Sequence, residues 1–172
     1  MTATLIRRRF APLVVAMAAA CGESDDRAFS SPNQLAPIVA EVDTGLIFTD
    51  GDDSVVLSLS DLEAIEVVQV ELFEPFVAAT STFQGPTVAA VFASLGWPTD
   101  GDVHMWAIND YAYDMSAADL IEGDAMIATR ENGVTIPIEA GGPARIVFPN
   151  WSAAHQLEDA WVWSLGSFNL LD

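Results

Sequence analysis

Residues 128–149 read ATRENGVTIPIEAGGPARIVFP, and this stretch predicts three strands. Asn132-Gly133 is a favoured dipeptide for the type I′ turn, because both of its residues tolerate a positive φ. It separates Met126–Thr129 from Val134–Ile138, so we expect these two runs to pair as a hairpin. After two glycines, Ile146-Val147-Phe148 predicts a further strand.

Upstream of this stretch the clearest helix begins after Gly85-Pro86. Apolar residues there recur at the helical spacing i, i+3, i+4 and i+7, and Gly96 is placed to end the helix. These apolar residues are Val88, Val91, Phe92 and Leu95. Ser60 and Glu63 form a capping-box pair, which predicts the start of a second short helix. A third is expected between Ser116 and Gly123.

The other expected elements are strands, and two of them form a hairpin across the acidic turn Asp50-Gly51-Asp52. They are Leu46–Phe48, Val55–Leu59, Val67–Phe73, Val103–Ile108, Tyr111–Met115 and Trp161–Phe168. The acidic turn lacks the later Gly and Glu of an EF-hand loop, so we interpret it as a hairpin turn. Many short strands mixed irregularly with a few short helices predict a mixed, β-rich α+β fold.

The composition is strongly acidic: 25 Asp and Glu stand against six Arg, no Lys is present, and the formal charge is −19. Three of the arginines precede residue 10, so residues 21–172 carry a formal charge of −22. This charge excludes sequence-independent nucleic-acid binding, and it argues against adhesion to anionic lipids through basic patches. The hydrophobic content of 51% still allows a buried core, and we expect one domain over residues 38–172.

Residues 1–20 predict a secretory signal peptide. Arg7-Arg8-Arg9 is its basic start, Phe10–Met17 its apolar segment, and Ala18-Ala19-Ala20 its small residues before cleavage. The apolar segment is too short for a membrane-spanning helix, which needs about 20 residues. The arginines followed by Phe10 also resemble a twin-arginine signal, which exports folded proteins.

Cys21, the only cysteine in the chain, makes the signal more specific. Small residues before a lone cysteine and a polar run after it resemble a bacterial lipoprotein signal, in which the cysteine is lipidated. We therefore expect an envelope protein that is anchored to the membrane through Cys21, with residues 21–37 as a polar tether, facing the periplasm or the outside. Ordinary cleavage after Ala20, which would leave a soluble exported protein, is the alternative.

The inventory excludes several site types. One cysteine provides no disulfide framework and no Cys-based zinc or iron–sulfur site. The two histidines, His104 and His155, lack metal-ligand spacing, and no serine-hydrolase elbow or phosphate-binding glycine motif is present. Beyond the tether, Arg130 and Arg145 are the only basic side chains with a permanent charge. Each can pair with a carboxylate such as Glu131 or Glu139, or receive an anionic ligand group.

The stretch 128–149 resembles the "NG…P…GxPxR…P" run of the oxidoreductase molybdopterin-binding domain, which has the sulfite-oxidase-type fold. Segments in the same order resemble other parts of this family: Phe83–Pro86 with its helix, Ala107–Tyr111 with Asp114 (typical of small, single-domain exported members), and Trp161–Trp163. The similarity covers roughly residues 55–170. It implies a molybdopterin or related pterin as cofactor. Our candidate pocket residues are Asn109, Tyr111, Arg130, Asn132 and Arg145.

The chemistry of the family is not matched. The resemblance implies that a cysteine thiolate before the G-x-P helix binds molybdenum, but Val70–Phe76 contains no cysteine, and a thioether is a poor substitute. We identify no metal ligand and no catalytic residue. Asn109 and Asn132 can also be explained as turn residues, and Tyr111 can be explained as a core residue. Phe73 and Phe76 are expected to form an apolar pocket rim or to fill the core.

We therefore expect a non-catalytic module that binds a small ligand or an envelope protein partner, although the resemblance to enzymes leaves the question of activity open. One alternative is a molybdopterin-dependent oxidoreductase whose metal has no protein thiolate. Another is a structural partner of a membrane protein with a filled pocket.

Overall fold

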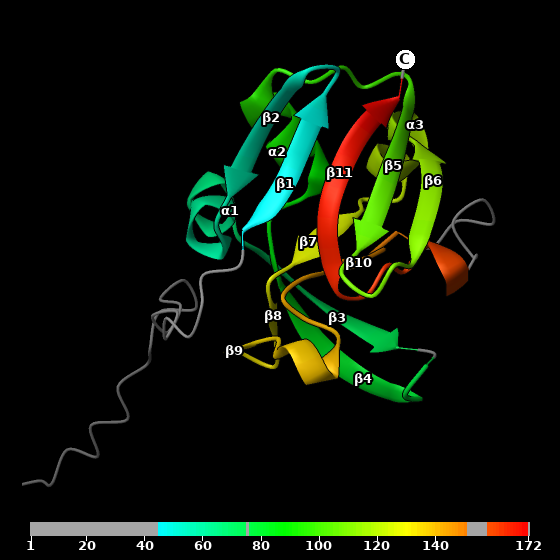
Figure 1. The fold of residues 1–172 in the computed structure, drawn as a ribbon. Coiled ribbons are helices and arrows are strands. Elements are labelled where there is room, and N and C mark those ends of the chain that lie inside the picture. The colour runs from blue at the N-terminus through cyan, green and yellow to red at the C-terminus, as the bar shows by residue number, and fades with distance from the viewer. Residues whose placement is uncertain (1–44, 75, 151–157, 172) are drawn as a thin grey trace, which may run out of the picture. The chain divides into compact units, whose positions relative to one another are not determined.

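Three β-sheets organise the chain in the computed structural model, which describes residues 45–74, 76–150 and 158–171. The predicted signal peptide, Cys21 and the tether lie outside these residues. The largest sheet has the strand order β2-β1-β11-β5-β6. In Figure 1 the last strand, β11 (Leu165–Leu171), runs between the first strand, β1 (Leu46–Asp50), and β5 (Asp102–Ala107). It is parallel to β1 and antiparallel to β5. This arrangement is the β-rich α+β fold expected from the sequence.

The other two sheets are smaller. The four-stranded sheet has the order β3-β4-β8-β9, and the two-stranded sheet pairs β7 with β10. The remaining strands are β2 (Asp53–Leu57), β3 (Val68–Glu74), β4 (Ala79–Gly85), β6 (Ala112–Ser116), β7 (Met126–Ala128), β8 (Arg130–Glu131), β9 (Val134–Thr135) and β10 (Arg145–Val147). The helices are α1 (Leu59–Ile65), α2 (Val88–Leu95) and α3 (Ala117–Glu122), with single 3-10 turns at Ile138–Ala140 and Glu158–Ala160.

Local sequence signals explain the ends of the helices. The side chain of Thr87 caps α2, and Gly96 ends it with a left-handed φ of 71°, as the sequence predicts. Ser116 caps α3, and Gly123 follows it. The prediction for α1 was two residues late, because Ser58, and not Ser60, forms the capping box, with Asp61. The carboxylate of Glu63, the other half of the predicted box, instead binds Thr129 and Arg130.

The turn at Asn132-Gly133 is confirmed, since φ is 51° and 82° at its two residues. Its flanking strands differ from the prediction, which paired Met126–Thr129 with Val134–Ile138. Met126–Ala128 pairs with β10, whereas β8 pairs with both β4 and β9. The chain therefore passes from one sheet to another at Thr129, whose N–H donates to the carbonyl of Gln84.

Two further predictions were wrong in detail. Strand β4 was missed, although it pairs with β3 over seven residues. The strand predicted over Trp161–Phe168 begins only at Leu165, because Ser164 has a φ of 54° and breaks the extended backbone. The hairpin across Asp50-Gly51-Asp52 is confirmed by the pairing of β1 with β2.

Aromatic side chains hold the core between the largest sheet and α2. Phe48 of β1 stacks on Phe168 of β11 with ring centroids 5.3 Å apart, and Phe92 of α2 packs edge-on against Phe168. All three are buried, which contributes roughly 1.5–3 kcal/mol of hydrophobic stabilisation for each ring. Gly85 begins the turn into α2, and a Cβ there would lie 2.0 Å from the carbonyl oxygen of Ile127.

No helix within residues 45–74, 76–150 and 158–171 is long and apolar enough to cross a membrane.

Candidate functional site

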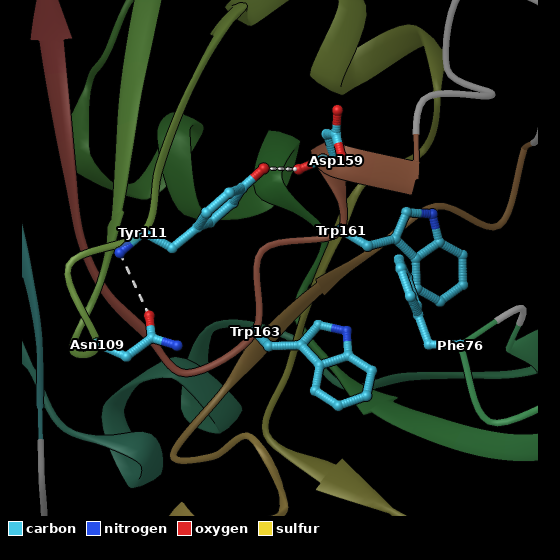
Figure 2. Close-up of a pocket in the computed structure, with 6 residues that line it drawn as sticks. All are labelled: Phe76, Asn109, Tyr111, Asp159, Trp161 and Trp163. Carbon is cyan, nitrogen blue, oxygen red and sulfur yellow. Dashed lines mark hydrogen bonds between the residues drawn. The ribbon is translucent and has the colours of Figure 1, made fainter.

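A pocket of about 280 Å³ opens where the β5–β6 connection faces the segment that precedes β11. Its lining residues are Phe76, Asn109, Tyr111, Asp159, Trp161 and Trp163. Figure 2 shows Asn109 and Tyr111 on one side of this space, and Phe76, Trp161 and Trp163 on the other. We call this site the aromatic pocket.

Local turn chemistry positions the two polar candidates. The connection between β5 and β6 turns at Asp110, which has a φ of 68°, and the N–H of Ala107 donates to the carbonyl of Tyr111. The side chain of Asn109 accepts a hydrogen bond from the N–H of Tyr111 at 3.3 Å. Asn109 therefore serves the turn and the pocket together.

Tyr111 closes one side of the pocket. Its hydroxyl donates to the backbone carbonyl of Asp159 at 2.7 Å, although the side chain remains 39% exposed. Partial burial raises the pKa of the Tyr111 phenol, and the negative charge of Asp159 raises it further, followed by a smaller effect of Tyr113. The pKa of Tyr113 is raised by burial and then by Asp159. The negative charge of Asp159 thus acts on both phenols, since it disfavours the formation of a phenolate at Tyr111 and at Tyr113.

The opposite wall is a cluster of three aromatic rings. Phe76 packs edge-on against Trp163 with ring centroids 5.5 Å apart, and against Trp161 at 6.4 Å. Trp161 is 4% exposed, Trp163 is half-buried and Phe76 is largely exposed. The backbone of this segment is held by a hydrogen bond from the N–H of Ile146 to the carbonyl of Val162. This hydrogen bond holds the segment that carries Trp161 and Trp163 beside β10.

Arg145 is not among the lining residues, but it contacts one of them: its guanidinium carbon is 4.1 Å from the centroid of the Trp163 ring. Its Nη1 donates to Glu74 at 3.0 Å, and Nη2 is 3.5 Å from a Glu131 oxygen. Nη2 also donates to the carbonyl of Ala140. The side chain is therefore already paired with two carboxylates. Of the two partners suggested by the sequence, Glu131 is found and Glu139 is not, and the pairing with Glu74 was not predicted.

Glu74 is 1% exposed at the end of β3. Burial raises the pKa of its carboxyl group, the positive charge of Arg145 opposes this effect, and the negative charge of Glu131 adds to it. Its Oε2 and the Nε of Arg145 have no hydrogen-bond partner among the residues that the structure describes. A buried ion pair with unsatisfied atoms contributes less to stability than a fully hydrogen-bonded one.

Arg130 does not line the aromatic pocket. Its Nε and Nη2 donate to the two oxygens of Glu63 at 2.8 and 3.2 Å, and its side chain is 2% exposed. Thr129 also donates to Glu63, at 2.7 Å. This pairing connects β8 with α1. Neither Glu131 nor Glu139 is its partner.

Asn132 also lies away from the aromatic pocket. It occupies the β8–β9 turn, where its side chain accepts a hydrogen bond from the N–H of Thr82 at 3.0 Å. The structure therefore brings Asn109 and Tyr111 to one pocket, places Arg145 against one of its walls, and separates Arg130 and Asn132 from it. Of the expected apolar rim, Phe76 lines the pocket and Phe73 is exposed.

Sequence reasoning did not assign Asp159, Trp161 and Trp163 to the site. The sequence predicts a strand over this segment, whereas Trp161, Val162 and Trp163 precede the extended backbone of β11. The only signal for a pocket was the concentration of aromatic residues in Trp161–Trp163. His104 pairs with Asp114 across β5 and β6, and His155 lies outside the described residues.

Comparisons with known proteins identify the class of fold. The chain resembles the sulfane dehydrogenase SoxCD from Paracoccus pantotrophus with a TM-score of 0.60 and 17% sequence identity, over 80% of this chain and 40% of that one. The match thus spans less than half of the length of the SoxCD chain. Residues 63–165 match the model of the oxidoreductase molybdopterin binding domain, and the protein therefore belongs to this family. No curated protein matches the sequence significantly.

Membership of this family suggests a pterin cofactor. The donor set does not fit a metal-bearing, phosphorylated pterin. The segment before α2 contributes buried Glu74 and no cysteine, and residues 45–74, 76–150 and 158–171 contain no group of three His, Cys, Asp or Glu side chains able to hold a metal. Arg130 and Arg145 are both neutralised by buried or half-buried carboxylates. A phosphate dianion would have to displace one of these pairs.

Proposed function

We propose that this protein is an exported, lipid-anchored binding module that uses the molybdopterin-binding fold without catalysing a molybdenum-dependent reaction. It presents the aromatic pocket to a small molecule in the cell envelope. An envelope protein that delivers or receives this molecule is the partner we expect.

The observation that carries the proposal is the commitment of both arginines. Arg130 donates to Glu63 through two nitrogens, and Arg145 donates to Glu74, whose carboxylate stands in the segment where the family resemblance implies a thiolate. Charge-assisted pairs of this kind are costly to break when they are buried. The acidic residues thus hold the cations that a pterin phosphate would need.

The proposed location rests on the leader and on Cys21. A cysteine that follows three alanines and precedes a polar run is typical of lipidation. Several acyl chains on this residue would hold the protein at a membrane, since each buried CH₂ contributes about 0.8 kcal/mol.

Metal and pterin analysis of the full-length protein, purified from its native envelope, tests the absence of molybdenum chemistry. We expect molybdenum far below one atom per chain and no releasable pterin. Stoichiometric molybdenum together with a pterin would contradict the proposal and favour a molybdopterin-dependent oxidoreductase without thiolate ligation.

Metabolic labelling with a fatty acid tests the anchor. The wild-type chain should incorporate the label and sediment with membranes, whereas Cys21→Ser should do neither. A wild-type protein that remains unlabelled and soluble after export would contradict lipidation and support cleavage after Ala20.

A further inference from the structure

We propose that the aromatic pocket binds an organic cation, specifically a quaternary ammonium group. The inference deepens the proposed function, because it names the chemical class of the ligand. The walls of the pocket, its charge and its hydrogen-bonding capacity each favour such a ligand.

The walls provide electron-rich ring faces. Of the six described residues that line the pocket, four are aromatic: Phe76, Tyr111, Trp161 and Trp163. Figure 2 shows that the rings come from both sides of the space. A cation within about 6 Å of such a ring is attracted by the ring quadrupole, and several rings around one cation form the usual recognition site for quaternary ammonium groups. Trp163 already receives one cation in this way, since the Arg145 guanidinium carbon lies 4.1 Å from its centroid.

The charge of the pocket favours the same ligand. Among the residues that the structure describes, no Arg, Lys or His side chain lines it, and the one carboxylate in its lining, that of Asp159, is exposed. The negative field of Asp159 disfavours ionisation of both Tyr111 and Tyr113. The same field attracts a cation and repels a phosphate or carboxylate, and the formal charge of −22 on residues 21–172 acts in the same direction.

The hydrogen-bonding capacity separates a quaternary ammonium group from other cations. The Asn109 oxygen already accepts from the N–H of Tyr111, and the Tyr111 hydroxyl already donates to the Asp159 carbonyl. A primary ammonium group carries three donors that would compete for the remaining lone pairs of these two oxygens and for the Asp159 carboxylate, whereas a quaternary group needs no acceptor. A metal cation needs several oxygen ligands, and the described residues offer one carboxylate to the pocket. A methylated cation therefore matches these walls best.

The size of the pocket suits a compact ligand. Its volume of about 280 Å³ lies near the lower end of small-molecule sites, which span roughly 300–1,000 Å³. We therefore choose choline as the probe.

Calorimetric titration of the full lipidated chain in a non-ionic detergent tests the inference. Choline is compared with its uncharged carbon isostere, in which a tert-butyl group replaces the trimethylammonium group. Because the two have nearly the same shape, the difference measures the charge alone. We expect choline to bind at least about tenfold more tightly than the isostere. Equal affinities, or no saturable binding of choline, would overturn the inference.

Matched variants locate the binding. Phe76→Leu and Tyr111→Leu keep apolar bulk but remove a ring face, and each should weaken choline binding about two- to tenfold. Both side chains are more than one third exposed, so these variants should fold, which circular dichroism will verify. Unchanged affinity in both variants would place the site elsewhere and overturn the inference.

The charge is tested by Asp159→Asn, which should weaken choline binding by a similar factor. Asp100→Asn, which removes an exposed carboxylate that does not line the pocket, should leave the affinity unchanged. Equal losses in the two variants would mean that general surface charge, and not this pocket, attracts the cation.

Failure of this inference can be distinguished from failure of the proposed function. Molybdenum in the native protein would contradict only the proposed function, and absent choline binding would contradict only this inference.

Discussion

The guanidinium carbon of Arg145 lies 4.1 Å from the ring centroid of Trp163, while a nitrogen of the same group donates to buried Glu74 at 3.0 Å. One side chain thus joins the wall of the aromatic pocket to an ion pair inside the protein. The stability of the fold and the shape of the pocket depend on the same charge, and substitution at this position should report on both.

Replacement of Arg145 by Met should destabilise the protein by about 3–5 kcal/mol, because Glu74 would remain buried without its counter-charge. Arg145 and Glu74 are 5% and 1% exposed, so solvent screens the pair weakly. Urea unfolding of both proteins near neutral pH measures the difference. The loss should shrink in the double variant with Glu74→Gln, since no buried charge is then left. A double variant as unstable as Arg145→Met would indicate that packing on Trp163 dominates.

The carboxyl of Glu74 predicts a specific pH dependence. Burial raises its pKa above the ordinary value of 4.5, so that the folded protein holds this proton more tightly than the unfolded chain. As the pH rises above about 4.5, the unfolded chain ionises first, and this group destabilises the fold until it ionises in the folded state too.

In Glu74→Gln this dependence disappears. The free energy of unfolding of the variant minus that of the wild type should therefore increase with pH above 4.5, by at most about 1.4 kcal/mol per pH unit, and then become constant. Urea unfolding at a series of pH values measures it. A difference that falls as the pH rises through this window would mean that Arg145 lowers the pKa more than burial raises it.

These ion pairs show where sequence reasoning about the site reached its limit. The scarcity of basic residues drew attention to Arg130 and Arg145, and the structure pairs both with carboxylates. Their main partners, Glu63 and Glu74, lie 67 and 71 residues away along the chain, respectively. Nothing in the local pattern distinguishes these two among 25 acidic residues, since only the tertiary packing of α1 and β3 brings them to the arginines.

The pair formed by Arg130 and Glu63 yields a third prediction. Glu63→Gln should destabilise the protein by about 3 kcal/mol, because Arg130 is 2% exposed and would lose its only carboxylate partner within the described residues. Glu71→Gln, an exposed position on β3, is the matched control and should change stability by less than about 0.5 kcal/mol. Thermal unfolding of the three proteins provides the comparison. Equal effects of the two substitutions would contradict a structural role for this pair.

The fold was predictable where short-range chemistry determines the backbone. The Asn132-Gly133 turn, the Gly96 cap and the hairpin across Gly51 each depend on a residue that accepts a positive φ. Strand partners beyond such hairpins were not predictable, because β8 is shared between β4 and β9 while the preceding residues pair with β10. Such pairing depends on contacts between residues that are distant in sequence. The packing of Phe76 against Trp161 and Trp163 is a contact of the same kind, and it could not be predicted either.

The last prediction concerns the field of Asp159. Burial and then this carboxylate raise the pKa values of Tyr111 and Tyr113 above 10.0, and these are the only two tyrosines in the chain. Spectrophotometric titration of phenolate absorbance therefore observes both groups without labels. In Asp159→Asn the titration midpoints should move down towards 10.0, because the negative charge is removed while the backbone carbonyl that accepts from Tyr111 remains. Tyr113→Phe assigns the remaining transition to Tyr111. Midpoints that are unchanged in Asp159→Asn would show that burial alone raises both pKa values, and would remove the electrostatic part of the argument for a cationic ligand.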